Sequence, residues 1–263
     1  MGEAVGRSDT LAGAGTVATY SGLIVVAELA GVVGFAIGGA ILDAALVTVL
    51  LGHYVWGERA PHRKLFPVLA LVALLRVLSV TAAVPRLPMV TWYITVGVAL
   101  LIGELLTIRL VEEPWERLNI KIRRWRLDVV IAAFGVPAGL IGYLLLRPGL
   151  LIPDAGPIQV FAGIIGIVVF GAFVEALLFR GLLQSVAIET FGDVRIGLVY
   201  AAAMSGVMYI GAGSLPYTIG VGAYALLLGA VILRGGSLWG AAASHGVALV
   251  GMAFIWPFVL ASA

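Results

Sequence analysis

The sequence contains no cysteine and few charged residues. Without cysteine there are no disulfides, no thiolate metal ligands and no cysteine nucleophile. Asp, Glu, Lys and Arg make up 11% of the 263 residues, whereas about a quarter is usual in soluble domains. Hydrophobic residues make up 62%, and the mean hydropathy is +1.12. These values predict an integral membrane protein and leave no stretch for a separate soluble domain.

Lysine is also scarce, with two residues against fourteen arginines. The formal charge of +2 does not come from a basic stripe interleaved with aromatic residues, so no nucleic-acid partner is expected. Residues 1–15 are rich in glycine and polar residues and lack the basic start of a secretory signal. Gly6 stands where myristoylation needs Ser or Thr, so no lipid anchor is expected either.

Long apolar runs fill most of the chain. A membrane-spanning helix needs about 20 apolar residues, and nine segments qualify: 16–36, 38–56, 65–84, 89–110, 129–146, 158–183, 194–212, 216–233 and 238–258. Only Gly38-Gly39 separates the first two segments, so they are either two helices in a tight hairpin or one broken unit. The predicted fold is therefore an all-α, polytopic transmembrane helix bundle with eight or nine spans.

The distribution of basic residues predicts the orientation of the bundle. Loop 57–64 carries Arg59, Arg63 and Lys64, and loop 112–128 carries five basic residues. The loops between and after them hold one arginine each, Arg86 and Arg147. By the positive-inside rule both basic loops and the N-terminus face the cytoplasm. We expect the protein to lie in the plasma membrane, in contact with lipid.

Loop 112–127 also divides the sequence. Four spans without a recognisable motif precede it, and five spans follow it. The sequence therefore predicts an N-terminal part, residues 1–127, and a C-terminal domain, residues 128–263.

Charged residues inside the apolar runs are the best guide to function. Placing one at membrane depth costs about 3 kcal/mol, so such a residue is usually paired or functional. Glu175 and Arg180 lie within one run, and His245 lies in the last. Arg76 falls midway along the third span. Arg76 could have a structural role, as the ion-pair partner of Glu28 or Glu104, or a functional role in a proton or ion path.

Two motifs in the second half carry a family resemblance. The first is Glu175-Ala176-Leu177-Leu178-Phe179-Arg180-Gly181-Leu182-Leu183-Gln184, and the second is Gly236-Ser237-Leu238-Trp239 followed by His245. From about residue 129 to 250 the chain resembles the CAAX-processing and bacteriocin-immunity (CPBP) superfamily of intramembrane proteases, relatives of the Ras-converting endopeptidase. The family motifs are Glu-Glu-x-x-x-Arg, Phe-x-x-x-His and His-x-x-x-Asn/Asp.

The sequence departs from these motifs at several positions. Ala176 replaces the second glutamate of Glu-Glu-x-x-x-Arg, and Gly213 replaces the histidine of Phe-x-x-x-His. Leu249 replaces the final Asn or Asp of His-x-x-x-Asn/Asp. Tyr209 takes the place of the phenylalanine. In an α-helix Glu175, five residues before Arg180, points away from it, whereas a glutamate at 176 would face it.

The resemblance assigns roles to the residues that remain. It implies that Glu175 and His245 are catalytic, with Glu175 activating water, and that Arg180 and Tyr209 support the site. It also implies zinc as the candidate metal, held by Glu175 and His245. Two protein ligands fall short of the three that catalytic zinc sites usually have, whereas a metal-free glutamate mechanism needs fewer residues.

The resemblance leaves two functions open. The first is an endopeptidase with a degenerate site that cleaves membrane-embedded or lipidated peptides, prenylated ones included. The second is a catalytically inactive relative that binds a peptide, a lipidated segment or a partner protein as a scaffold or immunity factor. A small transporter is a third, weaker hypothesis, based only on the buried charges.

Overall fold

The computed structural model describes residues 7–57, 61–83, 89–151 and 156–260. Within these ranges the chain is helical and has no strand. Nine helices in the described ranges are long and apolar enough to cross a membrane. The all-α transmembrane bundle predicted from the sequence is confirmed, with nine spans. Arg59, Arg86 and residues 1–6, on which sequence predictions were made, lie outside the described residues.

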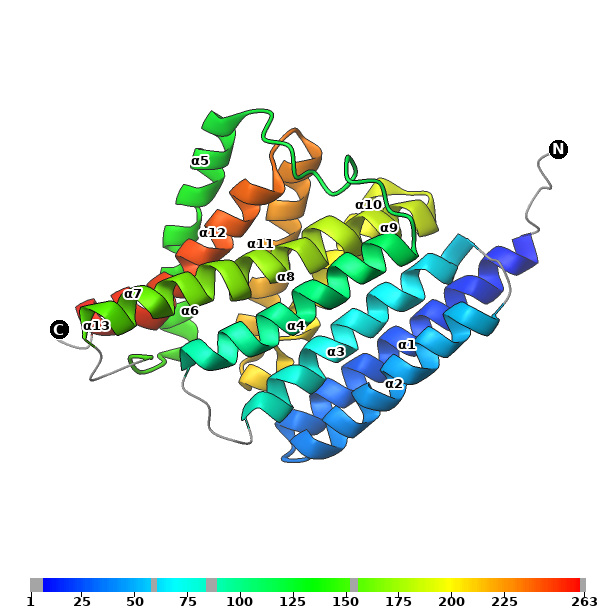
Figure 1. Ribbon diagram of the computed structural model, residues 1–263, viewed down its shortest axis with the longest axis horizontal. Helices are drawn as coiled ribbons and strands as arrows, with labels where there is room; N and C mark the ends of the chain where they lie inside the picture. The colour runs from blue at the N-terminus through cyan, green and yellow to red at the C-terminus, as the bar shows by residue number, and fades with distance from the viewer. Residues whose placement is uncertain (1–6, 58–60, 84–88, 152–155, 261–263) are drawn as a thin grey trace.

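The first four spans lie side by side in Figure 1. They are α1 (Arg7–Val32), α2 (Ala36–Trp56), α3 (Leu65–Ala83), preceded by a short 3-10 turn η1 (Pro61–Lys64), and α4 (Met89–Leu110). The turn between α1 and α2 falls at Gly34, whose φ of 89° suits glycine, and not at Gly38-Gly39 as expected. Gly39 instead lies inside α2, where an added Cβ would collide with the backbone of Ala27. Gly39 therefore allows close packing of α2 against α1.

The remaining five spans contain shorter helical pieces. One span joins α5 (Trp125–Ala133) to α6 (Gly135–Leu146), and two others are α10 (Val194–Val207), followed by the 3-10 turn η4 (Ile210–Ala212), and α11 (Leu215–Leu233). The last span contains α12 (Leu238–Val250), the π-helical stretch η5 (Gly251–Ile255) and α13 (Trp256–Leu260). Residues 111–124, which include most of the second basic loop, form turns and irregular chain before α5.

The longest span, Pro157–Phe191, runs obliquely through the bundle (Figure 1). It joins α7 (Pro157–Ile165), the π-helical η2 (Gly166–Phe173), α8 (Val174–Ala176), the π-helical η3 (Leu177–Leu183) and α9 (Gln184–Phe191). Its 35 residues extend about 50 Å at about 1.5 Å per residue, much more than the roughly 30 Å of a bilayer core. The helix must therefore tilt or project from the membrane, and Glu175 lies near its middle.

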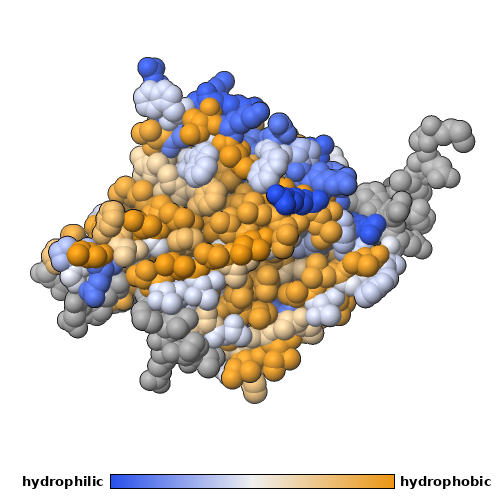
Figure 2. Space-filling view, in the orientation of Figure 1, coloured by the Kyte–Doolittle hydropathy of each residue, from blue (hydrophilic) through white to orange (hydrophobic). Residues whose placement is uncertain are grey.

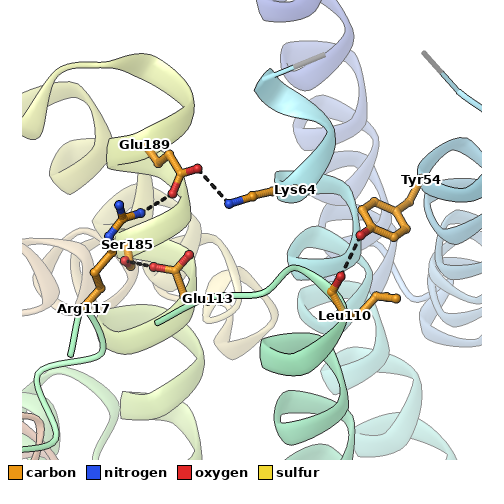
Figure 3. A network of polar contacts seen from close by, with 7 residues as sticks. All are labelled: Tyr54, Lys64, Leu110, Glu113, Arg117, Ser185 and Glu189. Carbon is orange, nitrogen blue, oxygen red and sulfur yellow. Dashed lines mark hydrogen bonds and ion pairs between the residues drawn. The ribbon is translucent and has the colours of Figure 1, made fainter. Parts of the chain in front are cut away.

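Hydrophobic side chains cover the middle of the face seen in Figure 2, and hydrophilic ones gather at one end. That end includes both basic loops, since Glu189 of α9 bonds Lys64 at 2.8 Å and also pairs with Arg117 (Figure 3). The two loops thus lie on the same side of the bundle. The protein is an integral membrane protein; its cytoplasmic N-terminus and its location in the plasma membrane stay predictions.

One hydrophobic core joins both halves of the chain. It contains α3 residues such as Phe66 and Val72 together with Leu178 and Leu182 of η3. The N-terminal spans therefore support the helix that carries Glu175 and Arg180. The division at residue 127 stays a prediction from the sequence.

Arg76 pairs with Glu28, one of the two expected partners. Its Nε lies 3.3 Å from Glu28 Oε1, and the Glu28 side chain is fully buried. Glu104 is also fully buried, but its carboxylate has no hydrogen-bond partner among the described residues, and neither has Asp43. The buried carboxylate of Glu28 is therefore paired with the partly exposed Arg76, while those of Glu104 and Asp43 have no ion pair among the described residues.

Replacing Arg76 with alanine should destabilise the bundle by about 3 kcal/mol, because Glu28 would be left as an unpaired buried charge. Thermal unfolding in detergent measures the loss, and Arg109→Ala, which removes an exposed arginine from the end of α4, is the matched control. Adding Glu28→Gln to Arg76→Ala should recover part of the stability. Equal stability of the two arginine variants would contradict a structural role for the pair.

Candidate active site in the membrane interior

Glu175 lies in α8, a three-residue α-helical piece between two π-helical stretches. In a π-helix the backbone hydrogen bonds join residues five apart, and such stretches are uncommon and frequent at functional sites. Here they widen the helix immediately before and after Glu175. The carboxyl side chain is 20% exposed, so it is not sealed in the core like Glu104.

Two hydrogen bonds converge on one oxygen of this carboxylate. Tyr209 Oη donates to Glu175 Oε2 at 2.8 Å, and His245 Nε2 lies 3.2 Å from the same atom. An ionised carboxylate only accepts, so a hydrogen bond from His245 requires a proton on Nε2. Oε1 has no partner among the described residues and remains able to accept from another group.

Tyr209 reaches Glu175 from the irregular chain that follows α10. Its ring packs edge-on against Tyr217, and its backbone oxygen accepts from Thr218 Oγ1 at 3.2 Å. These contacts with α11 fix the ring, so the hydroxyl points at the carboxylate. A phenylalanine at this position, as in the family motif, would lack that donor.

His245 is placed by close packing of α12 against its neighbours. Its side chain is only 6% exposed. An added Cβ on Gly139 of α6 would lie 2.6 Å from the backbone oxygen of Ala248, and one on Gly246 would lie 3.2 Å from Cγ2 of Val168 in η2. Glycine therefore lets α12 approach both α6 and the helix that carries Glu175.

Two cavities border the three polar residues. The larger, of about 590 Å³, is lined by Glu175 and Tyr209 and by side chains of α3 and α4, including Arg76, Trp92 and Tyr93. The smaller, of about 210 Å³, lies among α6, α11 and α12, and its lining includes His245, Tyr209 and mostly apolar residues. Tyr209, Leu249 and Met252 line both. The polar residues thus sit where two hollows adjoin.

Arg180 does not join this cluster. It makes no hydrogen bond or ion pair with Glu175 or with any other described residue, and it lines a third cavity near the basic end of the bundle. The structure thus brings Glu175, Tyr209 and His245 together and leaves Arg180 apart. Arg180 still interacts electrostatically with Glu175 and Tyr209, and its supporting role stays a prediction.

The substituted motif positions lie in different surroundings. Ala176 is buried in the core, and Leu249 lines both cavities beside His245. Gly213 adopts a φ of 72° and an added Cβ would meet nothing within 4 Å. Among the described residues, only the hydroxyl of Tyr209 adds a polar group to the glutamate–histidine pair.

The donor set does not fit a usual catalytic zinc site. Such a site has three protein ligands and an open position, and Glu175 and His245 supply two. No group of three or more His, Asp or Glu side chains suited to a metal occurs within the described ranges. We therefore assign no step to a metal.

Comparison with known families agrees with the motifs. Residues 157–250, which include Glu175, Arg180, Tyr209 and His245, match the family described as type II CAAX prenyl endopeptidase Rce1-like. Over this segment the chain is similar to the CPBP superfamily of CAAX-type proteases. No curated protein and no solved structure matched the chain. The family segment starts at α7, so α5 and α6 of the predicted C-terminal domain lie outside it.

Replacing Gly139 with alanine should push α6 away from α12, because the new methyl group would meet the backbone of Ala248. Overpacking of this kind costs about 1–3 kcal/mol, measurable as a lower unfolding temperature in detergent. Gly22→Ala is the control, since nothing lies within 4 Å of its added Cβ. If both variants were equally stable, close contact of α6 with α12 would be wrong.

Proposed function

We propose that this CPBP-like protein hydrolyses peptide bonds in the membrane, with Glu175 as the residue that activates water. The supporting observation is the pair of hydrogen bonds to Glu175 Oε2 from Tyr209 and His245. They hold the carboxylate in one orientation and leave Oε1 to accept from a water molecule in the larger cavity. A positioned carboxylate of this kind is a suitable general base.

The proposed reaction uses one water molecule and no other reactant. Glu175 takes a proton from the water, whose oxygen attacks the peptide carbonyl carbon. Once protonated, the carboxyl group accepts hydrogen bonds less well, so Tyr209 O–H and His245 Nε2–H can turn to the oxyanion. The carbon–nitrogen bond then breaks, and Glu175 returns its proton to the leaving amine.

The surroundings favour an apolar, membrane-associated substrate. The cavity beside His245 is lined mostly by apolar residues, among them Ile141, Leu145 and Val221, and the site lies midway along a membrane-spanning helix. We propose membrane-embedded or lipidated peptides, prenylated ones included, as substrates. The cytoplasmic side is the proposed side for the basic end of the bundle.

The second candidate is a catalytically inactive binding protein. The observation in its favour is the loss of three motif side chains, at Ala176, Gly213 and Leu249. Removing one oxyanion donor typically slows an enzyme by about 10²–10³-fold, and Tyr209 supplies one replacement for these losses. In this case the same cavities would hold a peptide, a lipidated segment or a partner protein without cleaving it, as in a scaffold or immunity factor.

Cleavage of quenched transmembrane and prenylated peptides by the purified protein decides between the two. Glu175→Gln should abolish cleavage, because the amide cannot take the proton. Tyr209→Phe should lower kcat by about 10²-fold, because one donor is lost.

Glu116→Gln, which changes a largely exposed glutamate of the basic loop, should retain full activity. Equal trace cleavage by all four proteins would reveal contamination and contradict the protease proposal. Saturable binding of an uncleaved peptide would then support the binding protein.

Removal of metal should leave the proposed cleavage unchanged, because the site offers two suitable protein donors where a catalytic zinc site has three. Dialysis against a chelator, followed by the same peptide assay and by metal analysis of the protein, measures this. Activity that is lost on dialysis and restored by zinc would overturn the metal-free mechanism.

A further inference from the structure

Arg180 is a buried cation that has no direct hydrogen bond or ion pair with any described residue and interacts with Glu175 only at longer range. Its side chain is 3% exposed, and Nε, Nη1 and Nη2 have no hydrogen-bond partner among the described residues. A guanidinium carries five N–H donors and cannot lose its charge in a protein. An unpaired buried charge is costly, so a site that keeps one calls for an anion.

Arg180 lines a cavity of about 320 Å³, which shares no lining residue with the two cavities beside the Glu175–Tyr209–His245 cluster. Arg117, Asn119, Gln184, Ser185 and Glu189 supply its other polar walls. Arg117 is 53% exposed, so the cavity opens toward water at the basic end. This cavity is therefore separate from the two cavities of the proposed reaction, although Arg180 itself interacts electrostatically with Glu175.

The other polar groups of the cavity already have partners. Ser185 Oγ donates to Glu113 Oε1 at 2.5 Å, Asn119 Nδ2 to the backbone oxygen of Arg117, and Gln184 Nε2 to that of Gly229. Glu189 pairs with Lys64 and with Arg117 (Figure 3). Because Glu189 is paired with two cations, the charged side chains around the cavity keep a net positive charge. The N–H groups of Arg180 are the donors that remain without a hydrogen bond.

We propose that this cavity binds a phosphate group, with Arg180 as the buried ligand and Arg117 at the entrance. Arginine matches phosphate through paired N–H···O bonds. The basic end also carries Lys121, Arg123, Arg124 and Arg126, and clusters of four to eight basic residues next to membrane spans attract anionic lipid headgroups. Ile188 and the 40% exposed Leu233 provide an apolar wall. The phosphate comes from a lipid headgroup or from free phosphate.

Three titrations of the full-length protein in phosphate-free, uncharged detergent separate these sources. The ligands are short-chain phosphatidic acid, the matched diacylglycerol without phosphate, and inorganic phosphate. A ligand that binds the folded state raises the unfolding temperature with its concentration, which gives an apparent Kd. We expect phosphatidic acid to bind and diacylglycerol not to bind. Inorganic phosphate that binds as tightly as phosphatidic acid would support the site and identify its ligand as free phosphate.

Variants then test the residues. Arg180→Gln should weaken phosphatidic acid binding at least tenfold, as loss of charge-assisted hydrogen bonds does, and Arg117→Gln should weaken it less. Lys121→Gln removes one charge from the same end, but Lys121 is 75% exposed and does not line the cavity, so binding should stay within twofold of wild type. If Arg180→Gln fails to fold, the comparison of phosphatidic acid binding by Arg117→Gln and by Lys121→Gln tests the site. Unchanged binding by the cavity variants, or an equal loss in Lys121→Gln, would overturn the proposal.

Discussion

The close approach of α12 to the long helix Pro157–Phe191 is the constraint on which the site depends. Glu175 and His245 are seventy residues apart in the sequence, and a hydrogen bond between them requires the two helix backbones to come close. Gly246 meets this requirement against Val168 of the long helix, and Gly139 of α6 does so against Ala248 of α12. In a bilayer, where lipid is as apolar as the side chains, close packing of small residues is a main source of helix association. The glycines of these helices therefore position the reactive groups.

The same packing places the charged residues of the spans in different surroundings. Glu175 is bonded twice and borders a cavity, Arg76 and Glu28 neutralise each other, and Arg180 lines a separate hollow at the basic end. Each arrangement reduces the cost of an ionisable group at membrane depth in its own way. Glu104 and Asp43 are fully buried without a hydrogen-bond partner in the described part of the chain, and neutral, protonated side chains would avoid the cost of burying their charge.

The fold and the family followed from the sequence because hydropathy and short motifs carry them. Nine apolar runs predicted eight or nine spans, and the described residues contain nine. The segments around Glu175 and His245 resembled the family that residues 157–250 match. The hydroxyl bond from Tyr209 was not predicted, because a substitution of tyrosine for phenylalanine does not show where the hydroxyl points. The spacing of Glu175 and Arg180 was judged from α-helical periodicity, whereas η3 is a π-helix. No sequence motif could predict that Trp92 and Tyr93 line the larger cavity, because they reach it through packing between the two halves of the chain.

The contact between η2 and α12 can be measured directly, because the chain contains no cysteine of its own. The Cβ atoms of Ala172→Cys and Gly246→Cys would lie 3.5 Å apart, within the range for a disulfide. Mild oxidation of this double variant should join the two cysteines within one molecule and remove their reactivity toward maleimide. A pair made of Gly246→Cys with Val169→Cys, which lies on the exposed side of η2, should stay reactive. Free thiols in the first pair and a disulfide in the second would contradict the placement of His245 against Glu175.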